Sequence, residues 1–171
     1  MIKPSIPAAL IDGFITELKW SSSIEVVKSI LGDPLSESNP EGYSDMPNIL
    51  FYPGIELYFT EKTNPVLEEI LVQVWQVSKF KHKQYPVNFG WIHQKLTLSE
   101  TIEKLTIQSL PHKVIYNSIA NVHGVLVNGR ISFTASEEAL KTGYFLITRL
   151  LFCKEQIEIN YNVVNVLENF S

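Results

Sequence analysis

The chain has 171 residues, of which 45% are hydrophobic and 19% are charged, and its formal net charge is −4. This balance is typical of a globular protein and not of a disordered one. The mild acidity argues against a nucleic-acid binder, which usually needs a strongly basic face. The single cysteine, Cys153, excludes an internal disulfide and a cysteine-rich zinc site.

The N-terminal segments predict two helices. Residues 8–20 place apolar side chains at helical spacing, and residues 24–31 do the same after three serines that offer N-cap oxygens. Gly32 and Pro34 fit the end of the second helix. Residues 1–20 lack the apolar run of a secretory signal. The most apolar stretch, residues 144–152, is far shorter than the roughly 20 residues of a membrane span. We therefore expect a soluble cytoplasmic protein.

Strands are predicted at residues 48–52, 55–60 and 69–78 in the first half, with the turn dipeptide Pro53-Gly54 between the first two. A basic stretch at residues 79–85 marks a candidate boundary. The second half repeats this order: a helix begins at Leu98 and ends at Pro111, and strands are expected at 114–119, 122–127, 131–134 and 145–152. Asn128-Gly129 is the strongest hairpin signal of the chain. The tail, residues 156–171, fits a final strand or a helix.

The two halves can be laid over each other at an offset of 74 to 78 residues. Ser23 falls on Thr101, residues 54–60 fall on 129–134 with one gap, and residues 70–77 fall on 145–152. This match indicates either a duplication or a shared succession of helices and strands. We predict an α+β fold of two tandem units, residues 1–80 and 81–171. Each unit is a helix plus an antiparallel three-stranded sheet, and the helices pack on one face.

One part of the first half resembles a known kind of protein. A helix ends in Leu31-Gly32-Asp33-Pro34, and the hairpin strands Ile49–Tyr52 and Ile55–Phe59 follow it. The pattern is similar to units of the β-lactamase-inhibitor-like fold and of bacterial immunity proteins encoded beside toxins, and covers about 50 residues. The resemblance implies a fold that binds another protein on a sheet face. The chain departs from exported relatives in lacking a lipoprotein cysteine at its start and cysteine pairs.

No motif for catalysis, metal binding or nucleotide binding stands out. The histidines are not spaced as ligand pairs on a helix. The one Cys–His combination to consider for nucleophilic catalysis is Cys153 with His123, but a free cysteine in an apolar strand is usually a small hydrophobe. The adjacent acids Glu68-Glu69 are more typical of a solvated edge than of acid–base chemistry. We expect no enzyme, no cofactor and no metal. The four histidines are His82, His93, His112 and His123.

Candidate binding residues lie in two places. The loop of residues 33–47 carries four acids and no base, and Tyr43 lies among them as a possible aromatic anchor. Such a loop would steer a basic partner, or it is simply a solvated connection. Tyr58 and Trp75 are expected on a sheet face that is either open and concave or covered by a second core layer. The four acids are Asp33, Glu37, Glu41 and Asp45.

These features predict a non-enzymatic binding protein, as a monomer or homodimer. The specific hypothesis is an immunity-type inhibitor that sequesters a basic toxin by covering its active site, with neither nucleic acid nor membrane as partner. The alternatives are an export chaperone for a secreted effector, a small-ligand-binding module around His123 and Arg130, and a structural adaptor.

Overall fold

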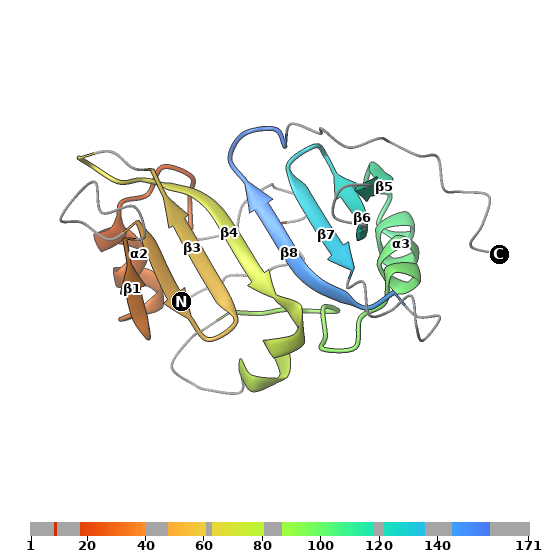
Figure 1. The fold of residues 1–171 in the computed structure, drawn as a ribbon, viewed down its shortest axis with the longest axis horizontal. Coiled ribbons are helices and arrows are strands. Elements are labelled where there is room, and N and C mark those ends of the chain that lie inside the picture. Colours follow the sequence, from red (N-terminus) through yellow and green to blue (C-terminus); the bar gives the residue numbers. More distant parts are fainter. Residues whose placement is uncertain are drawn as a thin grey trace.

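The computed structural model describes residue 9 and residues 18–39, 48–60, 63–80, 87–117, 122–135 and 145–157. Within these ranges the chain forms an eight-stranded antiparallel sheet with two α-helices and one 3-10 helix (Figure 1). The strand order across the sheet is β1-β2-β3-β4-β8-β7-β6-β5. The elements in chain order are α2 (Ile24–Leu31), β1 (Ser36–Ser38), β2 (Ile49–Tyr52), β3 (Ile55–Phe59), β4 (Leu67–Gln73), the 3-10 helix η1 (Val74–Phe80), α3 (Leu98–Ile107), β5 (His112–Asn117), β6 (Val122–Val127), β7 (Ile131–Ala135) and β8 (Ile147–Cys153).

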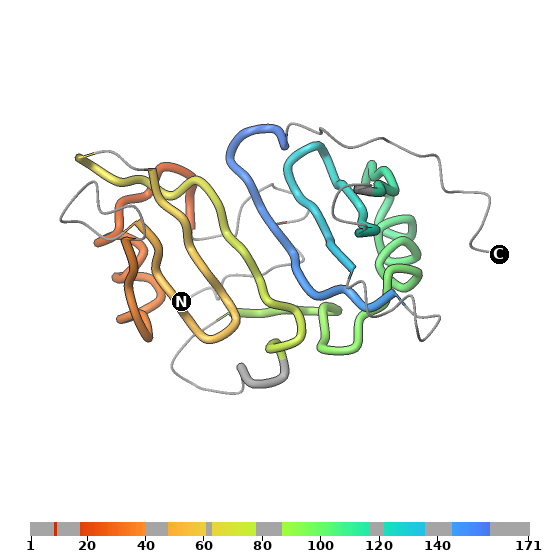
Figure 2. The backbone as a smooth tube through the Cα atoms, in the orientation of Figure 1, coloured from red at the N-terminus to blue at the C-terminus, as the bar shows by residue number. Residues whose placement is uncertain are grey.

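The predicted fold of two tandem helix plus three-stranded units is wrong. Each half contributes four strands, and β4 pairs directly with β8, so both halves build one continuous sheet. In Figure 2 the two strands run side by side at the centre of the molecule, although they are far apart in the sequence. The strand missing from the prediction is β1, whose sequence Ser36-Glu37-Ser38 has no apolar alternation and which is held by its pairing with β2.

Local signals explain the elements that were predicted correctly. Ser23 caps α2, where its Oγ accepts a hydrogen bond from the Val26 N–H, and Gly32 ends the helix with φ of +85°. The β6–β7 hairpin turns at Asn128 and Gly129, both with positive φ as a type I′ turn requires. These interactions connect residues that are close in sequence, so the local sequence pattern was sufficient to predict them.

The core lies between one face of the sheet and the helices. In β3 and β7 every second residue is buried, which is the alternation of a strand with one covered face. The buried apolar side chains of α2 and α3 belong to the same hydrophobic cluster as the buried apolar strand residues. The other face of the sheet, called here the open face, is not covered by any helix that the structure describes (Figure 1). The buried apolar residues of the two helices are Ile24, Val27, Leu31, Leu98 and Leu105, and Thr101 of α3 is buried as well.

The two halves have the same hydrogen-bond register. The pairings of β3 with β4 and of β7 with β8 match position by position, including a register shift at the same place in each pair. Leu71 and Leu151 are equivalent and also lie opposite each other, so an approximate two-fold axis passes between them. The equivalent positions include Ser23 and Thr97, Ile55 and Ile131, Tyr58 and Thr134, Leu67 and Ile147, Glu69 and Arg149, and Leu71 and Leu151.

This register corrects all three sequence matches between the halves. The alignment of residues 54–60 with 129–134 is shifted by two residues at its end, because the register places Ile131 at the position of Ile55 and Thr134 at the position of Tyr58, a constant offset of 76. Ser23 corresponds to Thr97 instead of Thr101, since these two residues form the equivalent isolated bridges to Val66 and Leu146. Ile70 corresponds to Leu150, so the offset grows to 80 residues at β4 and β8. A duplication in evolution stays a prediction, as does the division at residue 80.

Other expectations meet the structure only in part. The strand predicted for residues 69–78 ends at Gln73, where η1 begins. Of the helix predicted for residues 8–20, Ala9 is helical and residues 18–20 are not, and the rest lies outside the described residues. So does the tail after Ile157. In the part of the chain that the structure covers, every helix is too short or too polar to cross a membrane.

The N-terminus of α3 gives a first testable prediction. Thr97 and Glu100 form a capping box, in which the Thr97 Oγ1 accepts from the Glu100 N–H at 3.1 Å and the Glu100 carboxylate accepts from the Thr97 N–H at 3.1 Å. We expect Thr97→Ala to lower the free energy of unfolding by about 1 kcal/mol in urea denaturation. The matched variant is Ser23→Ala, which removes a single, longer cap bond of 3.4 Å. A larger loss for Ser23→Ala would contradict the prediction.

Candidate functional site

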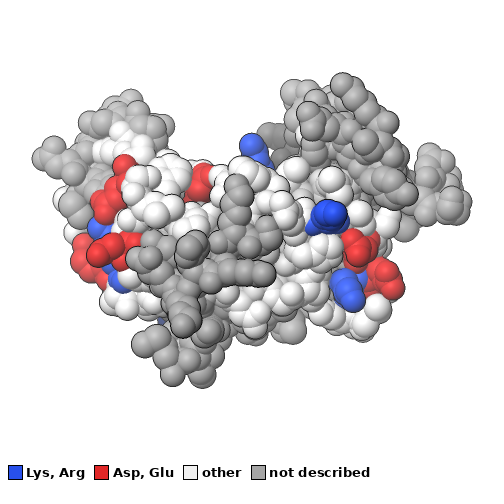
Figure 3. Space-filling view, turned by 90° about the horizontal axis from the view of Figure 1, so that it is seen from below, with Lys and Arg blue, Asp and Glu red and all other residues white. Residues whose placement is uncertain are grey.

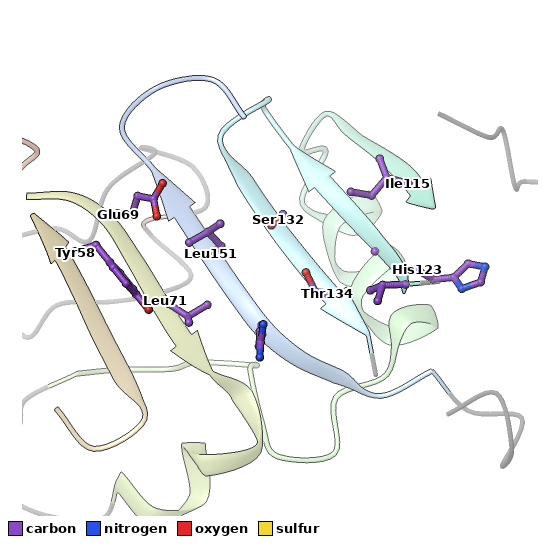
Figure 4. A pocket seen from close by; sticks show the side chains of 11 residues that line it. Tyr58, Glu69, Leu71, Ile115, His123, Ser132, Thr134 and Leu151 are labelled. Atoms are coloured by element: carbon purple, nitrogen blue, oxygen red, sulfur yellow. The ribbon is translucent and has the colours of Figure 1, made fainter. Parts of the chain in front are cut away.

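The main candidate site is a groove of about 460 Å³ on the open face of the sheet. Leu71 and Leu151 line it at the β4–β8 junction, where they lie opposite each other. Figure 4 shows Glu69 at one end of this junction, and Ser132 and Thr134 on β7 beyond Leu151. The residues that line the groove are Tyr58, Glu69, Leu71, Ile115, Val122, His123, Gly124, Ser132, Thr134, Arg149 and Leu151.

The groove has an acid and a base on opposite sides of the apolar pair Leu71 and Leu151. Glu69 lies across from Cys153, and Arg149 lies across from Gln73, each two residues from the central leucine of its own strand. Burial raises the pKa of the Glu69 carboxyl above its ordinary value, and the neighbouring Glu68 adds to this shift. Glu69 therefore carries a partly desolvated charge that an incoming cation would stabilise.

A second acid of the open face, Glu56, is already held by its neighbours. The Tyr58 hydroxyl donates a hydrogen bond of 2.6 Å to one carboxylate oxygen, and the Gln73 amide donates to the other. Gln73 in turn accepts a hydrogen bond from the Gln76 amide. Burial and the hydrogen bond to Glu56 raise the pKa of Tyr58 to about 12, so this hydroxyl is a donor and not a base. The network fixes Tyr58 as a rigid wall of the groove beside Glu69.

His123 reaches the groove with its backbone, not with its ring. Its partner across the β5–β6 pair is Tyr116, and the ring lies 4.7 Å from the rings of Tyr116 and of Phe145, measured between centroids. In Figure 4 the ring points away from the centre of the groove. Burial lowers the pKa of His123, which favours the neutral imidazole. The structure does not bring together Cys153 and His123, the combination considered for nucleophilic catalysis, because Cys153 contacts Glu69 at the other side of the groove.

Cys153 is an inert thiol in this arrangement. Burial, the charge of Glu69 and a hydrogen bond to its carboxylate at 3.9 Å raise the pKa of Cys153 to about 12. At pH 8 the thiolate fraction is then about 1000-fold smaller than for an ordinary thiol of pKa 9.0. Because a thiolate of higher pKa is also more nucleophilic, we expect the folded protein to react with a disulfide reagent such as DTNB at least about 30-fold more slowly than the urea-unfolded chain.

The matched variant for this prediction is Glu69→Gln, which removes the negative charge but keeps the shape of the side chain. The Cys153 pKa should fall and the labelling rate at pH 8 should rise, because the charge of Glu69 is the second cause of the shift after burial. Equal labelling rates in the folded and unfolded protein would show that Cys153 is an ordinary accessible thiol.

The structure separates the binding residues predicted from the sequence. Tyr58 lines the groove, but Trp75 lies in η1 beyond the end of β4, where it is 47% exposed. Glu37 lies across from the buried Leu50 and therefore faces the helix side of the sheet, where it forms an ion pair with Lys28 at 2.5 Å. Asp33 is exposed just after α2. The other three predicted residues, Glu41, Tyr43 and Asp45, lie outside the described residues.

Sequence reasoning missed Glu69 and Arg149 as site residues. The sequence places Glu69 in the Glu68-Glu69 pair, which is typical of a solvated edge, and Arg149 within the apolar stretch of residues 144–152. A charge inside an otherwise apolar strand was the available signal, because such a residue must face a surface that water or a partner reaches. That both charges belong to one groove depends on the β4–β8 pairing, which no local pattern indicates.

The described side chains do not bring three His, Cys, Asp or Glu residues together in a way that could hold a metal ion. In Figure 3 acidic and basic side chains both occur toward each end of the described surface, so this view shows no extended patch of one sign. Comparison with protein-family models, with curated proteins and with solved structures gives no significant match for the chain. The function therefore has to be argued from the groove itself.

Proposed function

We propose that this chain is a non-enzymatic protein-binding module of the immunity type, which sequesters a cognate toxin in the cytoplasm. The observation that carries the proposal is the open face of the sheet, where a groove with an apolar centre is flanked by Tyr58, Glu69 and Arg149. Tyrosine and arginine are enriched among the residues that dominate protein–protein binding energy.

The shape of the open face supports a protein as the partner. The strands are spaced about 4.8 Å apart, so eight strands span about 34 Å. The face combines half-buried apolar residues in the middle with polar residues around them, which is the usual composition of an interface core and its rim. The Glu56–Tyr58–Gln73 network holds one wall of the groove in place, which lowers the entropic cost of binding.

The acidic loop has a smaller part in this proposal than the sequence suggested. Because Glu37 is paired with Lys28, its charge is partly neutralised before any partner arrives. Asp33 and Glu37 also lie away from the groove, so their contribution is to the rate of encounter and not to the contact itself. The proposal therefore rests on the open face, with the loop as an aid to steering a basic partner.

The test is to express the tagged protein in its native host and to analyse the purified complex by light scattering and mass spectrometry. We expect one copy of this chain bound to one basic protein. The toxicity of that protein should be lost when the two are mixed at a 1:1 molar ratio. The variant Tyr58→Ala should weaken the complex, while Trp75→Ala, outside the groove, should not. A dimer that holds an unfolded effector segment would overturn the immunity-type function in favour of an export chaperone.

A second candidate is a small-ligand-binding module, favoured by the volume of the groove. About 460 Å³ is within the range of roughly 300–1,000 Å³ that small-molecule sites occupy. The sequence placed such a site around His123 and Arg130, but the ring of His123 points away from the groove and Arg130 does not line it. Native mass spectrometry of the protein purified from its host distinguishes a small-ligand-binding module from a protein-binding module, because a bound small molecule adds a defined mass that is smaller than that of a peptide.

A further inference from the structure

The approximate two-fold axis of the sheet exchanges the two charged residues of the groove. Glu69 and Arg149 occupy equivalent positions on β4 and β8, and Leu71 and Leu151 meet on the axis between them. The backbone of the β4–β8 junction is thus nearly symmetric, whereas its charge is opposite at the two ends. The line from Glu69 to Arg149 therefore has a direction. It begins at an acid, crosses the apolar pair Leu71 and Leu151, and ends at a base.

We infer that the groove binds an extended segment of the partner protein in which a basic and an acidic side chain lie four residues apart, with an apolar side chain midway. The basic side chain meets Glu69, the apolar one covers Leu71 and Leu151, and the acidic one meets Arg149. This inference rests on the proposed function, because it identifies the part of the partner that the open face holds.

The separation between Glu69 and Arg149 matches the distance between two side chains four residues apart in an extended segment. Glu69 and Arg149 are two residues on either side of the central pair on adjacent antiparallel strands. With a rise of about 3.4 Å per residue and a strand spacing of about 4.8 Å, their Cα atoms are about 14 Å apart. In an extended segment, side chains at i, i+2 and i+4 point to one face and span about 13.5 Å. The two patterns therefore match in length and in the position of the apolar residue.

Both charges are available to a ligand. Within the described part of the chain, the ion pairs are those of Lys28 with Glu37 and of His93 with Glu100, and neither involves the groove. The contact of Glu69 with the Cys153 thiol, at 3.9 Å, is weak. Glu56, by contrast, accepts two hydrogen bonds from side chains and has no need of a ligand. Charge complementarity therefore assigns the two ends of the segment to Glu69 and Arg149.

The direct test is a titration of the ¹⁵N-labelled protein with capped pentapeptides, followed by NMR. The probe is Lys-Ser-Leu-Ser-Glu, and the controls are Lys-Ser-Leu-Ser-Lys and Glu-Ser-Leu-Ser-Glu. We expect shift changes confined to β4, β8 and the neighbouring open-face residues, with each control binding at least about fivefold more weakly, since one attraction becomes a repulsion. No shift change at the groove at millimolar probe, or equal binding of all three peptides, would overturn the inference.

The internal symmetry provides a sharper test. The single reversals Glu69→Arg and Arg149→Glu should each weaken binding of the probe by about tenfold, because each replaces an exposed ion pair with a repulsion. The double reversal restores an acid and a base at equivalent positions, so the probe can bind after a half turn about the two-fold axis. We expect its affinity to return to within about threefold of the original chain.

The double reversal also controls for folding, since it carries both substitutions and should still bind. A double variant that binds no better than the single variants would overturn the inference. The test separates this inference from the proposed function. A native partner that binds the original chain and the single reversals equally would refute the charged segment but leave the binding module intact. The absence of any protein partner in the host would refute the proposed function.

Discussion

Replacing Phe133 with alanine is expected to lower the free energy of unfolding by about 3–5 kcal/mol, the range for aromatic truncations in a core. Phe133 is fully buried at the middle of β7 and stacks against Trp91, with ring centroids 6.0 Å apart and an interplanar angle of 18°. The substitution leaves a cavity under the sheet and removes this aromatic contact. Urea denaturation followed by tryptophan fluorescence and far-UV circular dichroism measures the loss.

Two comparisons make the result interpretable. Ser132→Ala changes the adjacent residue on the open face and should alter stability by no more than about 0.5 kcal/mol. If Phe133→Ala is too unstable to fold, Phe133→Leu offers a smaller truncation at the same position, with a cost between those of the other two variants. A loss below 1 kcal/mol for Phe133→Ala would contradict the buried position of this ring.

The equivalent truncation in the first half tests whether the sheet unfolds as one unit. Leu57 occupies on β3 the position of Phe133 on β7, and it is also fully buried. Because β4 pairs with β8 and one hydrophobic cluster contains residues of both halves, Leu57→Ala and Phe133→Ala should each move a single transition. Two separate transitions, one for each half, would indicate that the halves are independent domains.

The sequence predicted the parts of the fold that depend on neighbouring residues. The cap at Ser23, the stop at Gly32 and the turn at Asn128-Gly129 each act within a few residues, and the structure has them where the sequence placed them. The alternation from Ile55 to Phe59 likewise put Tyr58 on the face opposite the core. In these cases the residues of one short segment were enough to predict its local structure.

The rest of the fold depends on contacts between distant segments. The pairing of Leu71 with Leu151 joins residues 80 positions apart, and two apolar strands give no sign of which strand each will choose. Trp75 was misplaced for a related reason, because apolar residues continue after Gln73 while the backbone changes from strand to 3-10 helix. The groove was missed as a consequence, since it exists only where β4 and β8 meet.

Gly124→Ala is expected to destabilise the protein by about 3 kcal/mol, although it adds a single methyl group. A Cβ atom at this position would lie 2.4 Å from the backbone carbonyl oxygen of Phe133 on the neighbouring strand. Side-chain atoms can move aside, but this oxygen belongs to the β6–β7 pairing, so β6 would have to separate from β7. The first half carries Ile49 at the equivalent position, so the close approach is specific to the second half.

The measurements for Gly124→Ala are the free energy of unfolding and amide hydrogen exchange in β6 and β7. We expect faster exchange in these two strands and little change in β2 and β3, because the clash is local to the second half. The matched variant is Gly129→Ala in the same hairpin, where φ is +71° and the nearest atom is 4.0 Å away, so the cost is backbone strain of about 1 kcal/mol. If the Gly124→Ala protein were at least as stable as the Gly129→Ala protein, β6 and β7 would not approach as closely as the structure has them. The position of Gly124 in the lining of the groove would then also be wrong.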